Sequence, residues 1–160
     1  MIFVTIGALF PFDRLVKLMD ELAPSFAGEE FFAQIGRGAY TPHNMKYERL
    51  LEAAEFRRLL VQSRLLVAHA GMGSVISALE VNRAVVLLPR KMELGEHTTD
   101  HQAATARWLE GKQGIHVAWE DADLADTIRK ALSADPSQQA LSPSAPQPFV
   151  DRLKAYIDSV

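Results

Sequence analysis

The sequence predicts an α/β domain built on a doubly wound, mainly parallel sheet. Short apolar runs alternate with longer amphipathic ones through most of the 160 residues, which is the pattern of repeated strand–helix units. Glycine or proline follows most of the apolar runs, as expected where buried strands end in turns. The composition, with 48% hydrophobic and 23% charged residues, is typical of a globular chain that can bury a core of its own.

The first half of the chain opens this pattern. A β-branched and aromatic strand at 2–6 ends at Gly7, and Pro11 and Pro24 bracket a helix whose apolar residues recur at helical spacing. We expect a second strand at 31–35, a short third strand within 44–50 and a helix at 53–62.

The second half gives a clearer pattern. A buried strand at 64–69 is followed by a glycine turn at 70–73 and a helix at 74–81. The next strand, at 84–88, stops at Pro89, and the segment 90–99 is polar and irregular. The remaining expected elements are a helix at about 100–110, a short strand at 115–118 and a helix at about 122–132.

The composition changes toward the C-terminus, where the last 25 residues hold four of the eight prolines and no glycine. We therefore expect three parts: a domain at 1–133, an extended proline-rich linker at 134–148 and an amphipathic docking helix at 149–160. The helix carries Phe149, Leu153, Tyr156, Ile157 and Val160 at helical spacing. It is expected to dock on this domain, on a partner, or on a second copy of the chain.

Composition also excludes several function classes. The chain has no cysteine, which excludes disulfides, thiolate metal sites and a cysteine nucleophile, and fits a reducing cytoplasm. A net charge of -3 gives no general attraction to nucleic acid or anionic lipid. No apolar run approaches the ~20 residues that a membrane helix needs. The apolar start at 1–12 lacks the positive segment of a signal peptide.

The strongest functional signal is His-Ala-Gly-Met-Gly-Ser at 69–74, between a buried strand and a helix. Glycines there let the backbone turn sharply and let a ligand approach the main chain. The helix that follows presents unpaired N–H groups and the positive end of its dipole, which favour phosphate. Ser74 is placed to cap that helix or to bond a phosphate oxygen. A tight turn that binds nothing would produce the same short pattern.

The context of this motif favours a binding site. One strand–helix unit later, Pro89 opens a loop rich in charged residues and histidine. In an open parallel sheet, ligands bind at the carboxyl ends of the strands, near the switch in strand order. Both loops belong to that edge. We therefore expect six residues to converge on one ligand: His69, Gly73, Ser74, Glu93, His101 and Gln102.

Together these motifs resemble those of a known family. The segment 69–74, the helix after it, the strand ending at Pro89 and Asp-His-Gln at 100–102 are similar to the Rossmann-like, donor-binding C-terminal half of GT-B glycosyltransferases. The pattern is most similar to the small subunit of split transferases, which pairs with a membrane-anchored, acceptor-binding protein. Bacterial exopolysaccharide and capsule transferases and the eukaryotic dolichol-pathway UDP-GlcNAc transferase are examples. Val-Thr-Ile-Gly at 4–7 and Gly-Glu-His at 95–97 extend the resemblance over roughly residues 1–108.

The resemblance implies that the chain binds a UDP-sugar as donor, with no metal and no other cofactor. The diphosphate would be held by Gly7 and by the turn formed by Gly71, Met72, Gly73 and Ser74, with His69 close by as the candidate catalytic residue. Asp100, His101 and Gln102 would face the transferred sugar. Three residues of the polar loop would also bind the UDP-sugar: Arg90, Glu96 and His97.

The nucleoside contacts implied by the resemblance include one departure from the family pattern. Arg37 and Gly38 would approach the uracil. Related transferases usually carry a glutamate three residues after the motif serine to bind the ribose hydroxyls, and Ser77 stands there in this chain. Glu80, one helical turn further, is the candidate to replace it.

The resemblance also implies that two chains share the reaction. This chain would supply the donor site of a hexosyltransferase acting on a lipid-pyrophosphate-linked saccharide, in exopolysaccharide or capsule synthesis at the cytoplasmic face of the cell membrane. The partner would supply the membrane anchor, the acceptor site and the general base. Asp13 is a weaker candidate for that base, since its position after Pro11 favours capping of the first helix.

Three other functions are alternatives for this sequence. His97 and His101, four residues apart beside acidic residues, could form a metal site, although a charged loop is more often only solvated. An NAD-binding domain is disfavoured because the first turn lacks Gly-x-Gly-x-x-Gly and no acidic residue directly follows Ile35. A non-catalytic scaffold or regulatory subunit of the same fold stays open because Ser77 replaces the usual glutamate.

Overall fold

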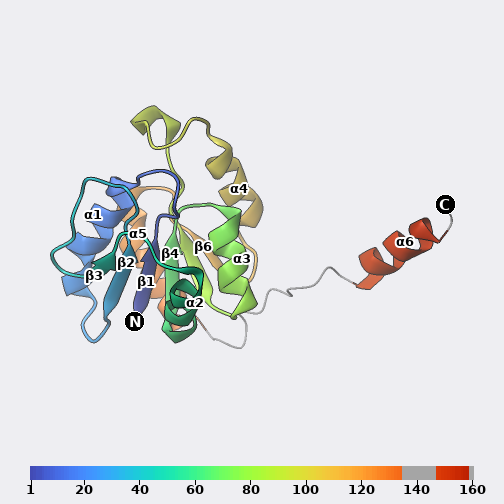
Figure 1. Cartoon of the computed structure of the whole chain (residues 1–160), viewed down its shortest axis with the longest axis horizontal. Helices are drawn as coiled ribbons and strands as arrows, with labels where there is room; N and C mark the ends of the chain where they lie inside the picture. Colours follow the sequence, from blue (N-terminus) through green and yellow to red (C-terminus); the bar gives the residue numbers. More distant parts are fainter. Residues whose placement is uncertain (135–146, 159–160) are drawn as a thin grey trace.

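The computed structural model describes residues 1–134 and 147–158, and its centre is one parallel sheet of six strands. In spatial order the strands are β3-β2-β1-β4-β5-β6 (Figure 1), and each neighbouring pair is parallel. The chain adds strands outward from β1 in one direction and from β4 in the other. The switch point therefore lies between β1 and β4. The predicted α/β, doubly wound fold is confirmed.

The strands are short, and those at the centre of the sheet are buried. They are β1 (Ile2–Thr5), β2 (Phe31–Gln34), β3 (Lys46–Glu48), β4 (Leu65–Ala68), β5 (Ala84–Leu87) and β6 (Ile115–Val117). Every residue of β1, β4 and β5 is buried, which explains why these strands read as continuous apolar runs without alternation. All six lie within the expected strand segments, including the short third strand.

The helices are α1 (Asp13–Leu22), α2 (Ala53–Gln62), α3 (Met72–Glu80), α4 (His101–Leu109), α5 (Leu124–Ser133) and α6 (Gln147–Ile157). α3 begins two residues before the expected start, because extended Gly71 already ends the turn. α6 also begins two residues early, since the first turn of a helix tolerates proline and accommodates Pro148.

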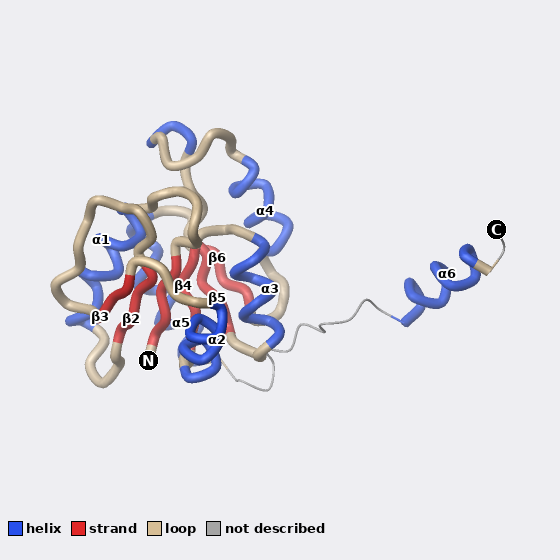
Figure 2. Tube along the Cα trace, viewed as in Figure 1, coloured by secondary structure: helices blue, strands red, loops and turns tan. Residues whose placement is uncertain are grey.

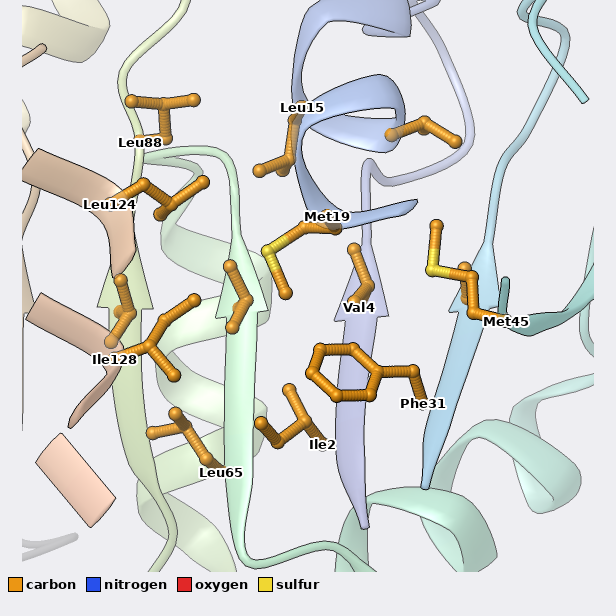
Figure 3. Packing of buried hydrophobic residues seen from close by; sticks show 14 of the residues in the cluster. Ile2, Val4, Leu15, Met19, Phe31, Met45, Leu65, Leu88, Leu124 and Ile128 are labelled. Atoms are coloured by element: carbon orange, nitrogen blue, oxygen red, sulfur yellow. The ribbon is translucent and has the colours of Figure 1, made fainter. Parts of the chain in front are cut away.

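Helices cover both faces of the sheet (Figure 2). On one face, α1 and α5 pack over the strands; on the other, α2, α3 and α4 do so. Figure 3 shows the first face, where Val4 of β1 and Leu65 of β4 lie among Met19 of α1 and Ile128 of α5. Burying apolar area on both faces fixes the strand ends and therefore the loops that build the site.

A buried carboxylate on α1 orders the loop between β2 and β3. Asp20 is 1% exposed and accepts hydrogen bonds from the Tyr40 hydroxyl (2.8 Å) and from the backbone N–H groups of His43 (3.0 Å) and Asn44 (2.6 Å). Burial alone raises the pKa of a carboxyl group, but these bonds outweigh it and lower the pKa of Asp20 below its ordinary value of 3.8. No sequence pattern marks Asp20 as buried, since a charged residue in an amphipathic helix is usually solvated.

The C-terminal helix α6 lies apart from the sheet (Figure 1). Its Leu153 and Ile157 side chains are 49% and 63% exposed. Most of the linker predicted at 134–148 falls outside the described residues, as does Val160. Docking of α6 on this domain, on a partner or on a second copy stays a prediction. Among the residues that the structure describes, no helix is long and apolar enough to span a bilayer.

Candidate functional site

The site lies at the switch point, where the loops after β1 and β4 leave neighbouring strands. Gly7 follows β1 and His69 follows β4, and the two strands are paired along their whole length. Helix α3 begins at Met72, directly after the loop that carries His69. Its first N–H groups therefore face the carboxyl edge of the sheet with no partner inside the helix. This is the arrangement that the motif at 69–74 predicts.

A cavity at this edge has a volume of about 600 Å³ and lies between α2 and α3. Seven of its lining residues come from the two glycine loops and from α3: Gly7, Ala8, His69, Gly73, Ser74, Ser77 and Glu80. Six of these, all except Ala8, were predicted as site residues. The opposite wall comes from the end of β2 and from α2, including Gln34, Phe56 and Leu60. The cavity thus combines a polar wall that can hold phosphate and ribose with an apolar wall that suits a base.

The apolar wall was not predicted as part of the site. The Phe56 ring packs edge-on against Phe3, with 5.2 Å between ring centroids. It also borders the cavity. No motif marks such a residue, because packing and ligand contact demand the same apolar side chain.

The imidazole of His69 is confined between two glycines. A Cβ atom at Gly7 would lie 2.9 Å from His69 Cε1, and one at Gly71 would lie 2.2 Å from His69 Nε2. Gly7 also has a φ of +74°, a conformation that other residues rarely adopt. Gly73, by contrast, has open space where its Cβ would be. Gly7 and Gly71 are therefore required by the position of the histidine ring.

Burial lowers the pKa of His69 to about 4 from its ordinary value of 6.5. Repulsion by the Arg90 guanidinium and by His97 contributes to this lowering, whereas the Thr5 backbone opposes it. Its buried Nδ1 has no hydrogen-bond partner within the described chain. His69 is therefore neutral near pH 7 and can donate a hydrogen bond to a phosphate oxygen without carrying a full charge.

Removing the Arg90 charge is expected to raise the pKa of His69. NMR titration of the imidazole should give a midpoint of about 4 in the wild-type protein and a higher midpoint in Arg90→Gln. The rise should be partial, because burial is the larger cause. Lys91→Gln is the matched control, since the Lys91 ammonium pairs with Glu120 at 2.7 Å and does not act on His69. An unchanged midpoint in Arg90→Gln would contradict this assignment of causes.

A second cavity, of about 220 Å³, adjoins the first. Gly7, Ala8 and His69 border both. The rest of the second cavity is lined by the loop after β1 and by the polar loop and α4, including Phe10, Arg90, His97, His101 and Gln102. The structure therefore brings together the two loops expected to converge. The wall that the two cavities share contains the candidate catalytic histidine.

Arg90 connects the loops around this second cavity. It is 4% exposed, and its Nη2 donates to the carbonyls of Ile6 and Phe10, both at 2.8 Å. Gln102 accepts the Arg90 backbone N–H through Oε1 at 3.2 Å. Burial lowers the pKa of Arg90 to about 10, with Glu96 acting in the opposite direction. The guanidinium thus stays charged and fixes the loop after β1.

Several predicted site residues lie elsewhere. Glu96 lines none of the cavities described, because Arg14 donates to both its carboxylate oxygens (2.7 and 2.8 Å) and the Lys91 N–H to one of them (2.8 Å). Asp100 accepts the Met92 N–H and borders a different cavity with Glu93. Neither carboxylate faces the two adjoining cavities.

The remaining corrections concern the turns. Ser74 does not cap α3, because Gly71 holds the cap position and makes no side-chain bond; Ser74 lies inside the first turn. Asp13 does not cap α1 either. Its Oδ2 accepts the Ala39 N–H at 2.9 Å, and its Oδ1 would lie 2.0 Å from a Cβ at Gly38. Met72 is 41% exposed, and Met72, Arg37 and Gly38 line neither adjoining cavity.

Glu96 is therefore expected to act on stability. Glu96→Gln should lower the free energy of unfolding by about 1–2 kcal/mol, because it removes the charge from a largely buried pair with Arg14. Glu93→Gln, an exposed substitution in the same loop, should change it by less than about 0.5 kcal/mol. Urea denaturation followed by circular dichroism measures both. Equal effects of the two substitutions would contradict a stabilising role of the Glu96–Arg14 pair.

The alternative of a metal site gains no support from the geometry. The His97 and His101 rings are perpendicular, with 4.5 Å between centroids, and His97 also contacts the Phe10 ring at 5.0 Å. Across the described ranges, 1–134 and 147–158, no three His, Asp or Glu side chains are gathered as a metal would require.

The fold is that of a half domain of GT-B glycosyltransferases. The family model of the glycosyltransferase family 28 C-terminal domain matches residues 1–156. The chain belongs to this family. No curated protein sequence matches it at a significant level.

Solved structures show the same fold at low sequence identity. The glycotransferase of kitacinnamycin has a TM-score of 0.65 and 19% identity, covering 86% of this chain and 36% of that one. MurG of Acinetobacter baumannii has a TM-score of 0.61 and 18% identity, covering 96% and 49%. ALG13 has a TM-score of 0.57 and 18% identity, covering 95% and 93%. The chain thus spans less than half the length of the first two structures and nearly all of the third.

Proposed function

We propose that this chain binds a UDP-sugar and is the catalytic subunit of a two-component, metal-independent hexosyltransferase. The proposed acceptor is a lipid-pyrophosphate-linked saccharide of exopolysaccharide or capsule synthesis, at the cytoplasmic face of the cell membrane. The observation that carries the proposal is the pair of adjoining cavities at the switch point, which meet at His69 beside the N-terminus of α3. Membership of the glycosyltransferase family 28 C-terminal domain supports it.

The two cavities suit the two ends of such a donor. The uridine would occupy the larger one, with its base against Phe56 and its ribose toward Ser77 and Glu80. The diphosphate would cross Gly7 and the first turn of α3, which leaves the sugar in the smaller cavity. Arg57 lies 3.7 Å from Glu80 across the mouth of the larger cavity, so ribose binding would compete with a weak, exposed ion pair.

The chemistry would be displacement at the anomeric carbon. The bond from this carbon to the diphosphate oxygen breaks, and its electron pair stays on the leaving nucleoside diphosphate. Backbone N–H groups at the start of α3 and a hydrogen bond from neutral His69 would stabilise the growing charge. The acceptor hydroxyl forms the new bond, and its proton goes to a general base that we place on the partner subunit.

A transfer assay with the acceptor-binding subunit tests this function. The expected result is transfer from a uridine nucleotide sugar by the pair of proteins, with a loss of about 100-fold or more in His69→Ala, because oxyanion-type donors contribute on this scale. Lys17→Ala, an exposed substitution on α1, is the control variant. Lack of uridine nucleotide binding, with and without the partner, would overturn the proposal.

The replacement of the usual glutamate by Ser77 favours one alternative, a non-catalytic nucleotide-binding scaffold of the same fold. The same assay separates the two functions. A scaffold would bind the nucleotide but leave full transfer activity in His69→Ala and in Ser74→Ala.

A further inference from the structure

The smaller of the two adjoining cavities has an unusual set of polar groups for a site that holds a neutral sugar. Its polar side chains are His69, Arg90, His97, His101 and Gln102, and no carboxylate is among the described residues that line it. Buried sugar hydroxyls need acceptors for their protons as well as donors for their oxygens, and carboxylates are the side chains that only accept. This cavity instead offers a guanidinium that only donates, together with imidazoles and an amide that carry both donors and acceptors.

The nearest carboxylates are turned away by interactions of their own. Glu96 is held by Arg14 and by the Lys91 N–H, and Asp100 accepts the Met92 N–H and borders a separate cavity. The charge of Glu96 still acts on Arg90, and Asp100 borders a separate cavity that Arg90 also lines, but neither carboxylate lines the smaller cavity. Its net character is set by one guanidinium and three imidazoles.

One buried donor of a residue that lines this cavity, Arg90 Nε, has no hydrogen-bond partner in the described chain. Arg90 is 4% exposed, and its Nη2 is already bound to the Ile6 and Phe10 carbonyls, which holds the guanidinium in place without a direct ion pair. A buried donor without a partner is unfavourable, so a ligand that supplies acceptors here would be favoured. An anionic group supplies the strongest acceptors.

We propose that the transferred sugar carries a carboxylate. The donor would then be a UDP-hexuronic acid whose carboxylate binds His97, His101 and Arg90. This inference rests on the proposed function, because the uridine diphosphate places the sugar in this cavity. His97 and His101 belong to the polar loop and α4, on the side away from Gly73 and the larger cavity. They are therefore assigned to the sugar, whereas His69, which borders both cavities, faces the diphosphate.

The pH dependence of binding gives the proposal a signature. Burial and the neighbouring His101 and Arg90 lower the pKa of His97, so the ring is neutral at pH 8 in the free protein. The groups that face it are Phe10 from the loop after β1, Arg90 from the end of β5 and His101 from α4. A bound carboxylate favours the protonated ring. Affinity for a uronate donor should therefore rise as the pH falls from 8 to 6, more than affinity for a neutral donor does.

Calorimetry with UDP, UDP-glucose and UDP-glucuronate tests the inference on the chain alone. At pH 6.5 we expect UDP-glucuronate to bind at least about tenfold more tightly than UDP-glucose, the equivalent of about 1.4 kcal/mol. In His101→Gln and His97→Gln this preference should fall to about twofold or less. His43→Gln, an exposed histidine outside both cavities, should keep it.

Each outcome of the calorimetry has one meaning. Equal affinity for the two sugar nucleotides, with UDP still bound, would overturn the uronate donor and leave the proposed function standing. A loss of UDP affinity as large as that of UDP-glucuronate in His97→Gln and His101→Gln would show that these rings read the diphosphate, which also overturns it. No binding of UDP to the wild-type chain would overturn the proposed function and this inference with it.

Discussion

Among substitutions that add a single methyl group, Gly71→Ala is expected to disrupt the site most. Its Cβ would lie 2.2 Å from Nε2 and 2.8 Å from Cδ2 of His69, and the ring is confined on its other side by Gly7. Either the ring moves out of the wall shared by the two cavities or the loop shifts. Overpacking of this kind costs about 1–3 kcal/mol of folding free energy. UDP affinity should fall by about tenfold or more, measured by calorimetry.

Two further variants separate the clash from the loss of a glycine. Gly73→Ala, two residues away, meets no atom within 4 Å and lies inside α3, so the free energy of unfolding should be unchanged or slightly higher. His69→Ala should make Gly71→Ala nearly harmless to stability, because the clashing ring is gone. If Gly71→Ala is equally destabilising with and without His69, the ring is not the reason for the glycine.

Asp20→Ala should produce the largest loss of stability. It removes a buried carboxylate that accepts from Tyr40, His43 and Asn44. Hydrogen bonds to charged groups contribute about 1.5–3 kcal/mol each, but the substitution also relieves the cost of burying the charge, so a net loss of about 3 kcal/mol is expected. Urea denaturation measures it. Asp126→Ala, an exposed residue paired only with Arg129, should cost less than about 1 kcal/mol.

The contribution of Asp20 should depend on pH in a defined direction. Its pKa is lower in the folded state than its ordinary value of 3.8, so the folded state favours the charged form. The stability difference between wild type and Asp20→Asn should therefore be fully present above about pH 5 and shrink as the pH falls through and below 3.8. A difference that grows on acidification would contradict this account of the carboxylate.

The fold was predictable because its signals are local. Strands such as β4 and β5 are buried on both faces, so their apolar runs are continuous, and Gly7 and Pro89 mark where strands end. Helix starts were less accurate. Ser74 has the right residue type for a cap, but Gly71, whose backbone is extended, holds the cap position. Sequence alone does not show which residue precedes the first helical one.

The candidate site was predictable where backbone geometry demands a residue type. The His69 ring leaves no room for a side chain at Gly7 or at Gly71, and the glycine motif indicates this. The direction of the side chains was not predictable. Glu96 and Gln102 are six residues apart, yet Glu96 pairs with Arg14 whereas Gln102 borders the smaller cavity. The apolar wall of the larger cavity was missed because packing against Phe3 already explains Phe56.

The central claim, that a uridine nucleotide binds at the switch point between β1 and β4, is tested most directly by NMR titration of the chain with UDP. The amide resonances of Gly7, Gly73, Ser74 and Ser77, which line the larger cavity, are expected to shift together and to saturate with one dissociation constant. Gly114, at the cavity near the start of β6, should stay unchanged. Shifts confined to Gly114 and its neighbours, or no shifts at any concentration of UDP, would contradict the account.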